Sequence, residues 1–290
     1  MKIDLHIHSR DCSDGKMTLP EIFEEAHRRD IGFISITDHD NIACQEKAAE
    51  LAARHQMIYL SGVELNVRFS HPDYKNGKPV SLDLLGYGFN PKDGPLTRKL
   101  NEVREYRQVR ARKILENIND EFKTAGMDLF TDRDLAAIAA SVDGSFGRPH
   151  IGAYMVRKKI VKDKQEAFDR FLVKCDVPKM SVSIDEASQL IRGAGGKLVL
   201  AHSNDPNGTS LVALTPSIKD QLEIINGTMR PFIDGVECWH SRHTPETTDA
   251  YQTFARSAGL IVTGGSDCHQ DPIIMGSVPV PAFVYEQFDV

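Results

Sequence analysis

Met1-Lys2-Ile3-Asp4-Leu5-His6-Ile7-His8 is the stretch around which this chain is organised. Its apolar residues alternate with polar ones, and this period of two predicts a short strand. The same geometry places His6 and His8 side by side on one face of that strand. Imidazole is a common ligand of divalent metal ions. The pair therefore indicates either a metal site or a polar strand face with two ordinary histidines.

The chain beyond this stretch repeats a regular rhythm of strands and helices. Apolar runs typical of strands occur at 32–36, 58–64, 80–87, 197–202, 235–240 and 260–269. Helical patterns lie between most of them, and Thr18 with Glu21 predicts a capping box for the first helix. Strand, polar end, helix and strand in succession indicate βα units with a parallel sheet. Seven strands are predicted in all, and the fold class is α/β.

The rhythm stops between residues 95 and 177, where helical patterns occur almost exclusively. The first predicted helix is long and charged, at 97–124, and shorter helices follow at 132–140, 148–158 and 165–174. We therefore divide the chain into a catalytic part, 1–94 with 178–290, and a helical insertion, 95–177.

The composition is that of an ordinary globular chain. Of 290 residues, 41% are hydrophobic and 26% are charged, and the formal net charge is -6. The negative charge offers no general attraction to nucleic acid or to an anionic membrane. There is no apolar run near the roughly 18 residues of a membrane span, and no signal-peptide pattern. A small anionic substrate remains compatible with this charge if positive charge is concentrated in one cleft; we expect no nucleic-acid polymer and no membrane, and the oligomeric state is not predicted.

The number and spacing of the cysteines indicate the cellular compartment. The five cysteines are odd in number, widely spaced and without a CxxC motif, at positions Cys12, Cys44, Cys175, Cys238 and Cys268. This spacing argues against a disulfide framework and against a thiolate zinc site. The cytoplasm is the expected location.

Acidic residues and histidines gather at one kind of position. Seven of them lie at or just beyond the C-terminal end of a predicted strand: His39, Glu64, Asp83, His202, His240, Asp267 and His269. In barrels of βα units this rim is where active-site residues gather. Any single one of these residues could be a capping or loop residue. Their concentration at strand ends favours a functional site.

The donor types indicate the chemistry. Nine candidate metal ligands offer nitrogen or oxygen and none offers a thiolate: His6, His8, Asp14, His39, Glu64, Asp83, His202, Asp267 and His269. Mixed imidazole and carboxylate ligands suit Zn, Mn or Fe. Ions about 3.5–4 Å apart can clamp a phosphoryl group and generate hydroxide near neutral pH. The residues alone therefore predict metal-assisted hydrolysis.

A family resemblance rests on motifs that span nearly the whole chain. They are Asp4-Leu5-His6-Ile7-His8-Ser9, Ser13-Asp14-Gly15, Thr37-Asp38-His39-Asp40, Gly62-Val63-Glu64, Leu84-Leu85-Gly86-Tyr87, Gly147-Arg148-Pro149-His150, Ala201-His202, Glu237-Cys238-Trp239-His240 and Gly265-Ser266-Asp267-Cys268-His269. In these motifs and their order the chain resembles the PHP (polymerase and histidinol phosphatase) family of metal-dependent phosphoesterases, in its small stand-alone branch. The resemblance implies a distorted seven-stranded (β/α)7 TIM-like barrel with a helical insertion, and two or three divalent metal ions.

The resemblance also implies a ligand set for each ion. His6, His8, Glu64 and Asp267 would hold one metal, and Asp14, His39 and His269 a second. Glu64 would bridge to a third, completed by His202 and the residue at position 83. Many relatives have histidine there, whereas this chain has Asp83. A carboxylate at this position can ligate the third ion, leave it weakly held, or serve in proton transfer.

Other residues are expected to bind or protonate the substrate. A guanidinium group binds phosphate oxygens in a bidentate fork, so Arg148 is the first choice for the phosphate, unless it only makes a local ion pair. His150, Arg242 and His243 are further candidates for phosphate binding. The predicted catalytic residues are Asp267, Asp83 and His240, and a histidine of this rim would protonate the leaving oxygen. Glu237 and Asp38 are expected to orient ligand imidazoles.

The predicted function is hydrolysis of small phosphate esters by attack of a metal-generated hydroxide on phosphorus. The substrate is either a phosphomonoester, such as a nucleotide or a nucleoside 3',5'-bisphosphate, or a small cyclic phosphodiester, such as ribose 1,2-cyclic phosphate. A DNA or RNA exonuclease of the same fold would need the basic stripe or stacking aromatic residues that the sequence lacks. The sequence is also compatible with histidinol phosphatase and with a non-catalytic metal-binding regulatory module.

Overall fold

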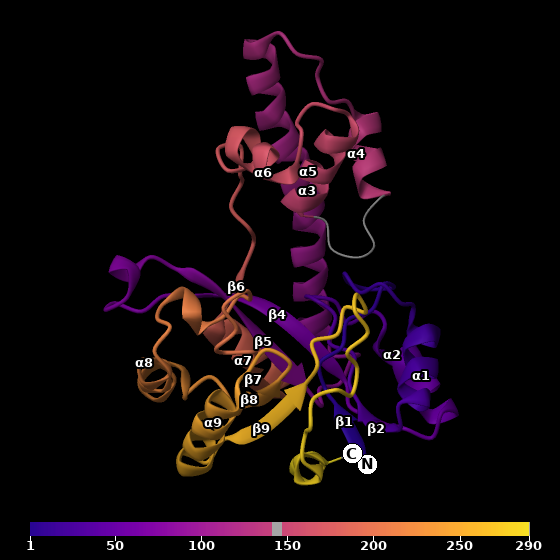
Figure 1. Ribbon diagram of the computed structural model, residues 1–290, viewed down its shortest axis with the longest axis vertical. Coiled ribbons are helices and arrows are strands. Elements are labelled where there is room, and N and C mark those ends of the chain that lie inside the picture. The colour runs from indigo at the N-terminus through magenta and orange to yellow at the C-terminus, as the bar shows by residue number, and fades with distance from the viewer. Residues whose placement is uncertain (141–146, 290) are drawn as a thin grey trace. The chain divides into compact units, whose positions relative to one another are not determined.

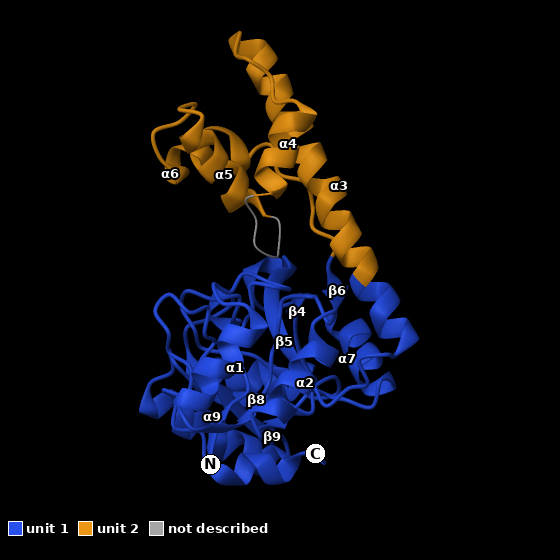
Figure 2. Cartoon of the chain, turned by 90° about the vertical axis from the view of Figure 1, so that its right-hand side faces the viewer, with its two compact units in different colours: residues 1–100, 181–290 blue, residues 101–180 orange. Residues whose placement is uncertain are grey.

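The computed structural model describes residues 1–140 and 147–289, and the chain forms two compact units. The first contains Met1–Leu100 and Ser181–Val290, and the second contains Asn101–Met180 (Figure 2). The sequence placed the ends of the insertion at 95 and 177. Each unit has a hydrophobic core of its own.

The first unit contains two β-sheets (Figure 1). The smaller sheet has three parallel strands in the order β1 (Lys2–Asp4), β2 (Ile31–Ile34) and β3 (Ile58–Tyr59). The larger has six strands in the order β6 (Val182–Ser183), β4 (Gly62–Phe69), β5 (Val80–Tyr87), β7 (Lys197–Leu200), β8 (Gly235–His240) and β9 (Ile261–Gly265). Isolated bridges join Ile7 to Cys268 and His39 to Glu64. The predicted α/β class is confirmed, and the closed barrel stays a prediction.

The described residues form nine strands, whereas seven were predicted. The predicted strand at 58–64 is divided at Leu60 and Ser61, because the chain changes partners there. Tyr59 pairs with β2, whereas Gly62 already pairs with β5. The other additional strand, β6, has two residues and was too short to predict.

The uniformly parallel sheet predicted from the βα rhythm is wrong at β5. This strand runs antiparallel to both β4 and β7, whereas β7, β8 and β9 are parallel to one another. Only ten residues, 70–79, connect β4 to β5, and a parallel crossover needs about a dozen or more. The reversal places Asp83, in the first half of β5, beside the end of β7, where Ala201 N donates to the Asp83 carbonyl oxygen.

Helices of the first unit lie close to where the sequence predicted them. They are α1 (Leu19–Arg28), α2 (Gln45–Arg54), α7 (Ile184–Gly193), α8 (Ile218–Ile224) and α9 (Pro245–Ala258). The capping box of α1 is confirmed, with Thr18 and Glu21 each accepting a hydrogen bond from the other's backbone N–H. Buried Phe23 of α1 and Ala52 of α2 pack with Ile34 of β2 in one core.

The segment around β1 is buried on both faces. Leu5 N donates to Gly264 O of β9 at 3.2 Å, and the Tyr87 hydroxyl of β5 donates to Leu5 O at 2.7 Å. Gly265 is required for this approach, because a Cβ atom there would lie 2.4 Å from His6 N. While β1 itself pairs with β2, the residue after it is thus bonded to β9 and to Tyr87 of β5, which fixes the positions of His6 and His8.

Asp4 anchors β1 to the segment after β9. Its buried carboxylate accepts hydrogen bonds from Ser266 N at 2.9 Å, Ser266 Oγ at 2.6 Å, Gly276 N at 2.8 Å and His6 N at 3.3 Å. Burial raises the pKa of Asp4, although these donors act in the opposite direction. Because four donors converge on one side chain, Asp4 connects the two ends of the chain at the site.

The second unit is helical. It contains most of α3 (Gly94–Ala125), followed by α4 (Asp132–Ala139), α5 (Arg148–Arg157), α6 (Lys164–Ala167) and a π-helical turn, Phe168–Leu172. Its core includes Ile118 and Phe122 of α3 together with Ile151 and Met155 of α5. None of the described helices combines the length and the apolar character needed to cross a bilayer.

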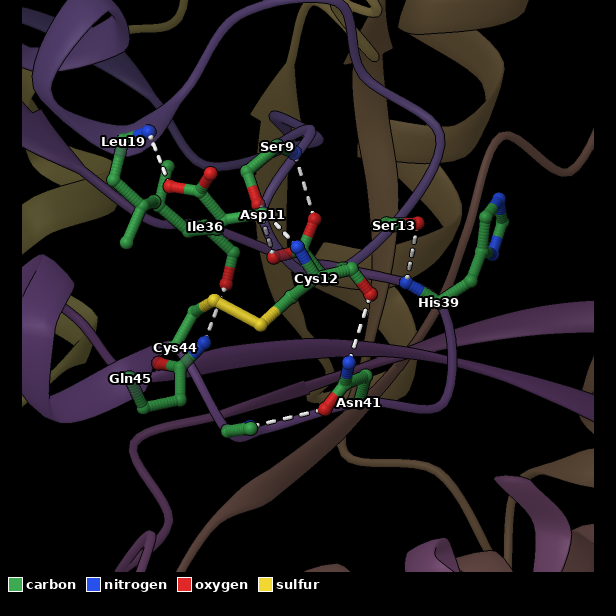
Figure 3. Close-up of a disulfide and its surroundings, with 12 residues drawn as sticks. Ser9, Asp11, Cys12, Ser13, Leu19, Ile36, His39, Asn41, Cys44 and Gln45 are labelled. Atoms are coloured by element: carbon green, nitrogen blue, oxygen red, sulfur yellow. Dashed lines mark hydrogen bonds between the residues drawn. A yellow bond between two sulfur atoms is a disulfide. The ribbon is translucent and has the colours of Figure 1, made fainter. Parts of the chain in front are cut away.

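The structure corrects the prediction that the chain lacks disulfides. Cys12 and Cys44 form one, with an S–S distance of 2.00 Å and a Cα–Cα distance of 6.2 Å (Figure 3). Cys175, Cys238 and Cys268 are free and buried. The pair escaped prediction because its partners are 32 residues apart in sequence and become neighbours only when the loops before α1 and α2 meet.

Replacing the anchor of β1 should destabilise the first unit. In Asp4→Ala, four buried donors lose their acceptor, and we expect the free energy of unfolding to fall by at least about 3 kcal/mol. Urea denaturation followed by circular dichroism measures the change. Glu24→Ala, on the exposed face of α1, is the control and should stay within about 0.5 kcal/mol of the wild type. Equal stability of Asp4→Ala and the control would contradict the anchoring role.

Candidate metal centre

The structure brings all nine predicted metal donors together in the first unit. They form three overlapping groups, and within each group one donor atom per residue lies within 4.8 Å of all the others. Loops and strand ends supply most of them: His6 and His8 after β1, Asp14 before α1, His39 after β2, Glu64 in β4, Asp83 in β5, His202 after β7, and Asp267 and His269 after β9.

The first group, which we call the inner site, consists of His6, His8, Glu64 and Asp267, all buried. His8 Nε2 lies 3.1 Å from Glu64 Oε2 and 3.3 Å from Asp267 Oδ1. His6 Nε2 lies 3.4 and 3.5 Å from the same two oxygens. Ligands about 2.1 Å from one tetrahedral ion are about 3.4 Å apart. The separations therefore fit a shared metal ion.

The second group, which we call the outer site, consists of His8, Asp14, His39 and His269. His269 Nε2 lies 3.2 Å from Asp14 Oδ1, whereas His8 Nδ1 and His39 Nε2 lie 3.8 and 3.9 Å from the Asp14 carboxylate. His269 can donate its Nδ1–H to Asp267 O at 3.1 Å, which leaves Nε2 as an acceptor or ligand. The separations of His8 and His39 from Asp14 are longer than those of the inner site, whereas that of His269 is similar to them.

The third group consists of Glu64, Asp83 and His202. His202 Nε2 lies 2.9 Å from Glu64 Oε1 and 3.9 Å from Asp83 Oδ2. The Asp83 carboxylate also accepts hydrogen bonds from Asn66 Nδ2 at 2.6 Å and from the Thr209 hydroxyl. Asp83 is thus also bound by two protein groups outside the set of candidate ligands.

The chemistry of the inner donors fits a divalent ion. His6 Nε2, both ring nitrogens of His8 and Glu64 Oε2 are buried and make no well-formed hydrogen bond within the described residues. Glu237 Oε1 accepts the Nδ1–H of His6 at 3.0 Å, which leaves His6 Nε2 with a lone pair toward the centre. Glu237 thus contacts a candidate ligand imidazole as expected, and its orienting role stays a prediction. Asp38, by contrast, binds Ser9 N and Ser9 Oγ rather than an imidazole.

Electrostatics favours protonated imidazoles in the metal-free protein. Burial lowers the pKa of His8, but the carboxylates of Asp267 and Glu64 outweigh it and raise the pKa to about 10. Burial also lowers the pKa of His202, but the neighbouring Glu64 carboxylate outweighs it and raises this pKa to about 9. His6 also has a raised pKa, because the charges of Glu237, Glu64 and Asp267 outweigh its burial.

The pKa values of the carboxylates Asp83 and Asp267 shift in opposite directions. Burial and the neighbouring charge of Glu64 raise the pKa of Asp83 to about 8. Burial acts on Asp267 in the same sense, but the imidazoles around it hold its pKa well below the usual value. In the metal-free protein at neutral pH, Asp83 is therefore protonated and Asp267 is ionised.

Two donors occupy strained backbone conformations. Asp267 has φ of 55° and His202 has φ of 23°, and both values lie in the region that favours glycine. Such conformations cost about 1–3 kcal/mol each and persist where the surroundings fix them. At both positions the strain coincides with a side chain directed into the centre.

An open pocket of about 690 Å³ adjoins the metal centre. Asp267 and His269 line its inner end, and Arg242 lies on its wall. Apolar side chains, including Pro272 and Val278, form another part of the lining. Pockets of this volume are typical of small-molecule sites.

Arg242 lies between two carboxylates. Its Nη2 atom is 2.5 Å from Asp267 Oδ2, and its Nε atom is 2.8 Å from Asp205 Oδ2. Asp205 is fully buried, and the guanidinium of Arg242 is about half exposed. Sequence reasoning missed Asp205, since Asp before Pro206 is typical of a turn. Its place three residues after His202, at the end of a strand, was the available signal.

The two predicted histidines on this wall have different environments. His240 is buried, and its Nδ1 accepts a hydrogen bond from Arg242 N at 3.2 Å. The proton of a neutral His240 is therefore on Nε2, which lies 3.5 Å from Asp267 Oδ2. His243 donates its Nδ1–H to Cys238 O at 3.0 Å and stacks on Tyr251. Burial lowers the pKa of His243, so this ring is neutral near pH 7.

Arg148 and His150 belong to the second unit, at the start of α5. Arg148 Nη1 forms an ion pair with Asp176 Oδ2 at 2.7 Å, and its guanidinium lies 5.6 Å from the centre of the Phe168 ring. His150 Nδ1 accepts a hydrogen bond from Gly147 N in the helix cap. The local ion pair that the sequence allowed for Arg148 is therefore present. The phosphate-binding role of both residues stays a prediction.

Comparison with known proteins gives one family and several relatives. The family model of the PHP domain matches residues 4–173. A 3',5'-nucleoside bisphosphate phosphatase of Chromobacterium violaceum is 28% identical, over 92% of this chain and 87% of its own length. A 5'-3' exoribonuclease of Haemophilus influenzae is 29% identical, over 69% of this chain and 68% of its own length. A phosphoribosyl 1,2-cyclic phosphate 1,2-diphosphodiesterase of Eggerthella lenta is 25% identical, over 92% of this chain and 93% of its own length.

A solved structure is similar over nearly the whole chain. It is the crystal structure of a Bifidobacterium adolescentis protein described as a metal-dependent phosphoesterase, with a TM-score of 0.74 and 26% identity. The similarity covers 98% of this chain and 94% of that protein.

Metal binding to the metal-free protein should release protons. Because the pKa values of His8 and His202 are about 10 and about 9, both imidazoles carry protons at pH 7.5 and must lose them to become ligands. We expect about two or more protons released per chain when Mn²⁺ is added, and an affinity that falls as the pH is lowered. Calorimetric titration in two buffers of different ionisation enthalpy measures the release. A heat of binding that is the same in both buffers would contradict the prediction.

Proposed function

This chain belongs to the PHP domain family, and on that premise we propose that it is a metal-dependent phosphoesterase that hydrolyses small phosphate esters. The observation that carries the proposal is the convergence of nine nitrogen and oxygen donors beside a pocket that contains one arginine. We propose two or three divalent ions, with Mn, Fe or Zn as the metals that suit these donors. The names of the similar phosphatase, diphosphodiesterase and phosphoesterase support this assignment.

The residues around the pocket have separable roles in such a reaction. When bound, divalent ions would activate water and neutralise charge on the phosphoryl oxygens. Glu237 holds His6 in one tautomer, and Glu64 and Asp267 are shared between donor groups. The Nε2 atom of His240 lies 3.5 Å from Asp267 Oδ2 in the lining of the pocket, where its N–H can donate a hydrogen bond to a phosphoryl or leaving oxygen.

The pocket supports a small substrate rather than a polymer. Its volume of about 690 Å³ suits a ligand of nucleotide size. With Nε and Nη2 of Arg242 paired to Asp205 and Asp267, its Nη1 offers a charged donor for a phosphate, and the apolar lining suits a base or a sugar face. We propose a nucleoside bisphosphate or a sugar cyclic phosphate as the substrate class, with Asp83 and Asp267 among the groups on which the reaction depends.

An exoribonuclease is the second candidate, because three similar proteins carry that name. Removal of nucleotides from an RNA end uses the same hydrolysis of a phosphate ester. RNA oligomers therefore belong in the substrate test beside the small esters. The distorted barrel and the cytoplasmic location, which the sequence predicts, remain proposals of the same kind.

The proposed activity is tested directly by phosphate release. The Mn-loaded protein should release phosphate from a nucleoside 3',5'-bisphosphate or from phosphoribosyl 1,2-cyclic phosphate after ring opening. Asp267→Asn removes an inner-site carboxylate, so kcat should fall by at least about 100-fold. Asp30→Asn, in the exposed turn after α1, is the matched control and should keep full activity. Phosphate release from none of the small esters or RNA oligomers would overturn the proposal.

Arg242 should act on substrate affinity more than on turnover. Arg242→Lys keeps the charge but loses the fork, and a charge-assisted hydrogen bond is worth about 1.5–3 kcal/mol, so we expect KM to rise about 10- to 100-fold. Steady-state kinetics on the preferred substrate measures KM and kcat separately. Arg256→Lys, on the exposed face of α9, should leave both unchanged. An unchanged KM in Arg242→Lys would exclude Arg242 from phosphate binding.

A further inference from the structure

One covalent bond lies next to the outer site, the group formed by His8, Asp14, His39 and His269. The Cys12–Cys44 disulfide joins the loop before α1 to the loop before α2 (Figure 3). Cys12 precedes Asp14 by two residues, and Cys44 follows His39 by five. Both bonded cysteines are buried. The bond therefore connects the two loops that carry Asp14 and His39.

Hydrogen bonds between the same two loops show how closely they pack. His39 N donates to Ser13 Oγ at 3.1 Å, and Asn41 Nδ2 donates to Cys12 O at 2.8 Å (Figure 3). Asp38 accepts from Ser9 N and from Ser9 Oγ, both at 2.7 Å. The position of Asp14 relative to His39 is thus determined by contacts between loops, with the disulfide as their covalent part.

The inner and outer sites differ in how their donors are supported. At the inner site, His6 and His8 have no exposure and Glu64 has 1%. At the outer site, the side chain of Asp14 is 41% exposed, that of His269 35% and that of His39 25%. The position of Asp14 therefore depends on its loop rather than on surrounding packing. Freedom in that loop would weaken the outer site first.

Other contacts would keep the loop folded without the disulfide. Gln270 Oε1 accepts from Lys16 N at 2.7 Å and from Met17 N at 3.1 Å, and Asp11 accepts from Leu19 N. These bonds hold the far end of the loop to the segment after β9 and to α1. Loss of the disulfide should therefore change the freedom of Asp14 without unfolding the unit.

We propose that the Cys12–Cys44 disulfide is a positioning element for the outer metal site, and that breaking it lowers the divalent-ion affinity of this site while the inner site is unchanged. The proposal rests on the proposed metal dependence. The physical reason is entropic, because a loop that samples more conformations must be ordered when Asp14 binds an ion. A thiol-reducing environment would then set the occupancy of the outer site.

Reduction of the disulfide by a phosphine consumes one molecule of water. A phosphine attacks the Cys12–Cys44 bond, water supplies the oxygen of the phosphine oxide, and the two sulfurs leave as thiols. The phosphine is oxidised by two electrons, and the disulfide is reduced by the same two.

The test compares Mn²⁺ binding to metal-free protein in three forms: oxidised wild type, phosphine-treated wild type freed of reagent, and Cys12→Ser/Cys44→Ser. Calorimetry or Mn²⁺ electron paramagnetic resonance gives the number and affinity of the sites. We expect two classes of site in the oxidised protein. In the other two forms, the weaker class should lose at least about tenfold in affinity, and the tighter class should be unchanged. The double variant should not respond to phosphine.

Controls separate positioning from simple destabilisation. Cys175→Ala removes a free thiol from the second unit and should bind Mn²⁺ like the wild type, with the same response to phosphine. A merely structural role of the disulfide would weaken both classes of site. Weaker Mn²⁺ binding at the outer site alone, with the tighter class unchanged, is therefore the result that supports positioning.

Three outcomes would overturn the inference. They are unchanged affinity in both the reduced protein and the double variant, equal weakening of both classes, and alkylation with mass spectrometry that finds free thiols at Cys12 and Cys44 in the oxidised protein. Failure of the oxidised wild type to bind Mn²⁺ at all would instead overturn the proposed function.

Discussion

The buried carboxylate of Glu64 is the constraint on which the centre depends. Its side chain is 1% exposed, and a charge so placed is costly unless opposite charge or a metal ion surrounds it. Four imidazoles from three segments surround it, with nitrogens 2.9 to 3.4 Å from its oxygens: His6, His8, His39 and His202. Glu64 belongs to two of the three donor groups. The strands that meet around it must therefore keep their register, and Asp4, Tyr87 and Gly265 fix β1 accordingly.

Sequence reasoning found the donors because each depends on a local pattern. His6 and His8 follow from a period of two, and His39, His202 and Asp267 from the polar ends of apolar runs. Direction and pairing between strands are not local, so the antiparallel course of β5 was missed. Asp83 still reached the centre, because the reversed strand brings its first half to the edge where β7 ends. The disulfide was missed for the same reason, since two loops far apart in sequence create it.

The candidates for substrate binding were harder to rank from sequence, because an arginine motif does not reveal its partners. Arg148 stands in the more suggestive motif, yet in its own unit it is engaged by Asp176 and Phe168. Arg242 stands in an ordinary loop, yet it lies on the pocket wall between Asp205 and Asp267. A buried acid such as Asp205 cannot be distinguished from a turn residue until its surroundings are known. Candidate ligands at strand ends can be predicted from the sequence. Acidic residues in loops that hold another side chain in position, such as Asp205, cannot.

The opening His6-x-His8 pair contributes to two candidate donor groups whose other members differ in exposure. His6 Nε2 and His8 Nε2 face the inner site, where burial and strand pairing leave the donors little freedom. His8 Nδ1 faces Asp14, so the same ring also borders the outer site, whose other ligands come from exposed loops. A movement of those loops would not require His8 to move, because its backbone is paired with Cys268. The proposed independence of the two sites is consistent with this arrangement, because the donor that they share lies on the strand side.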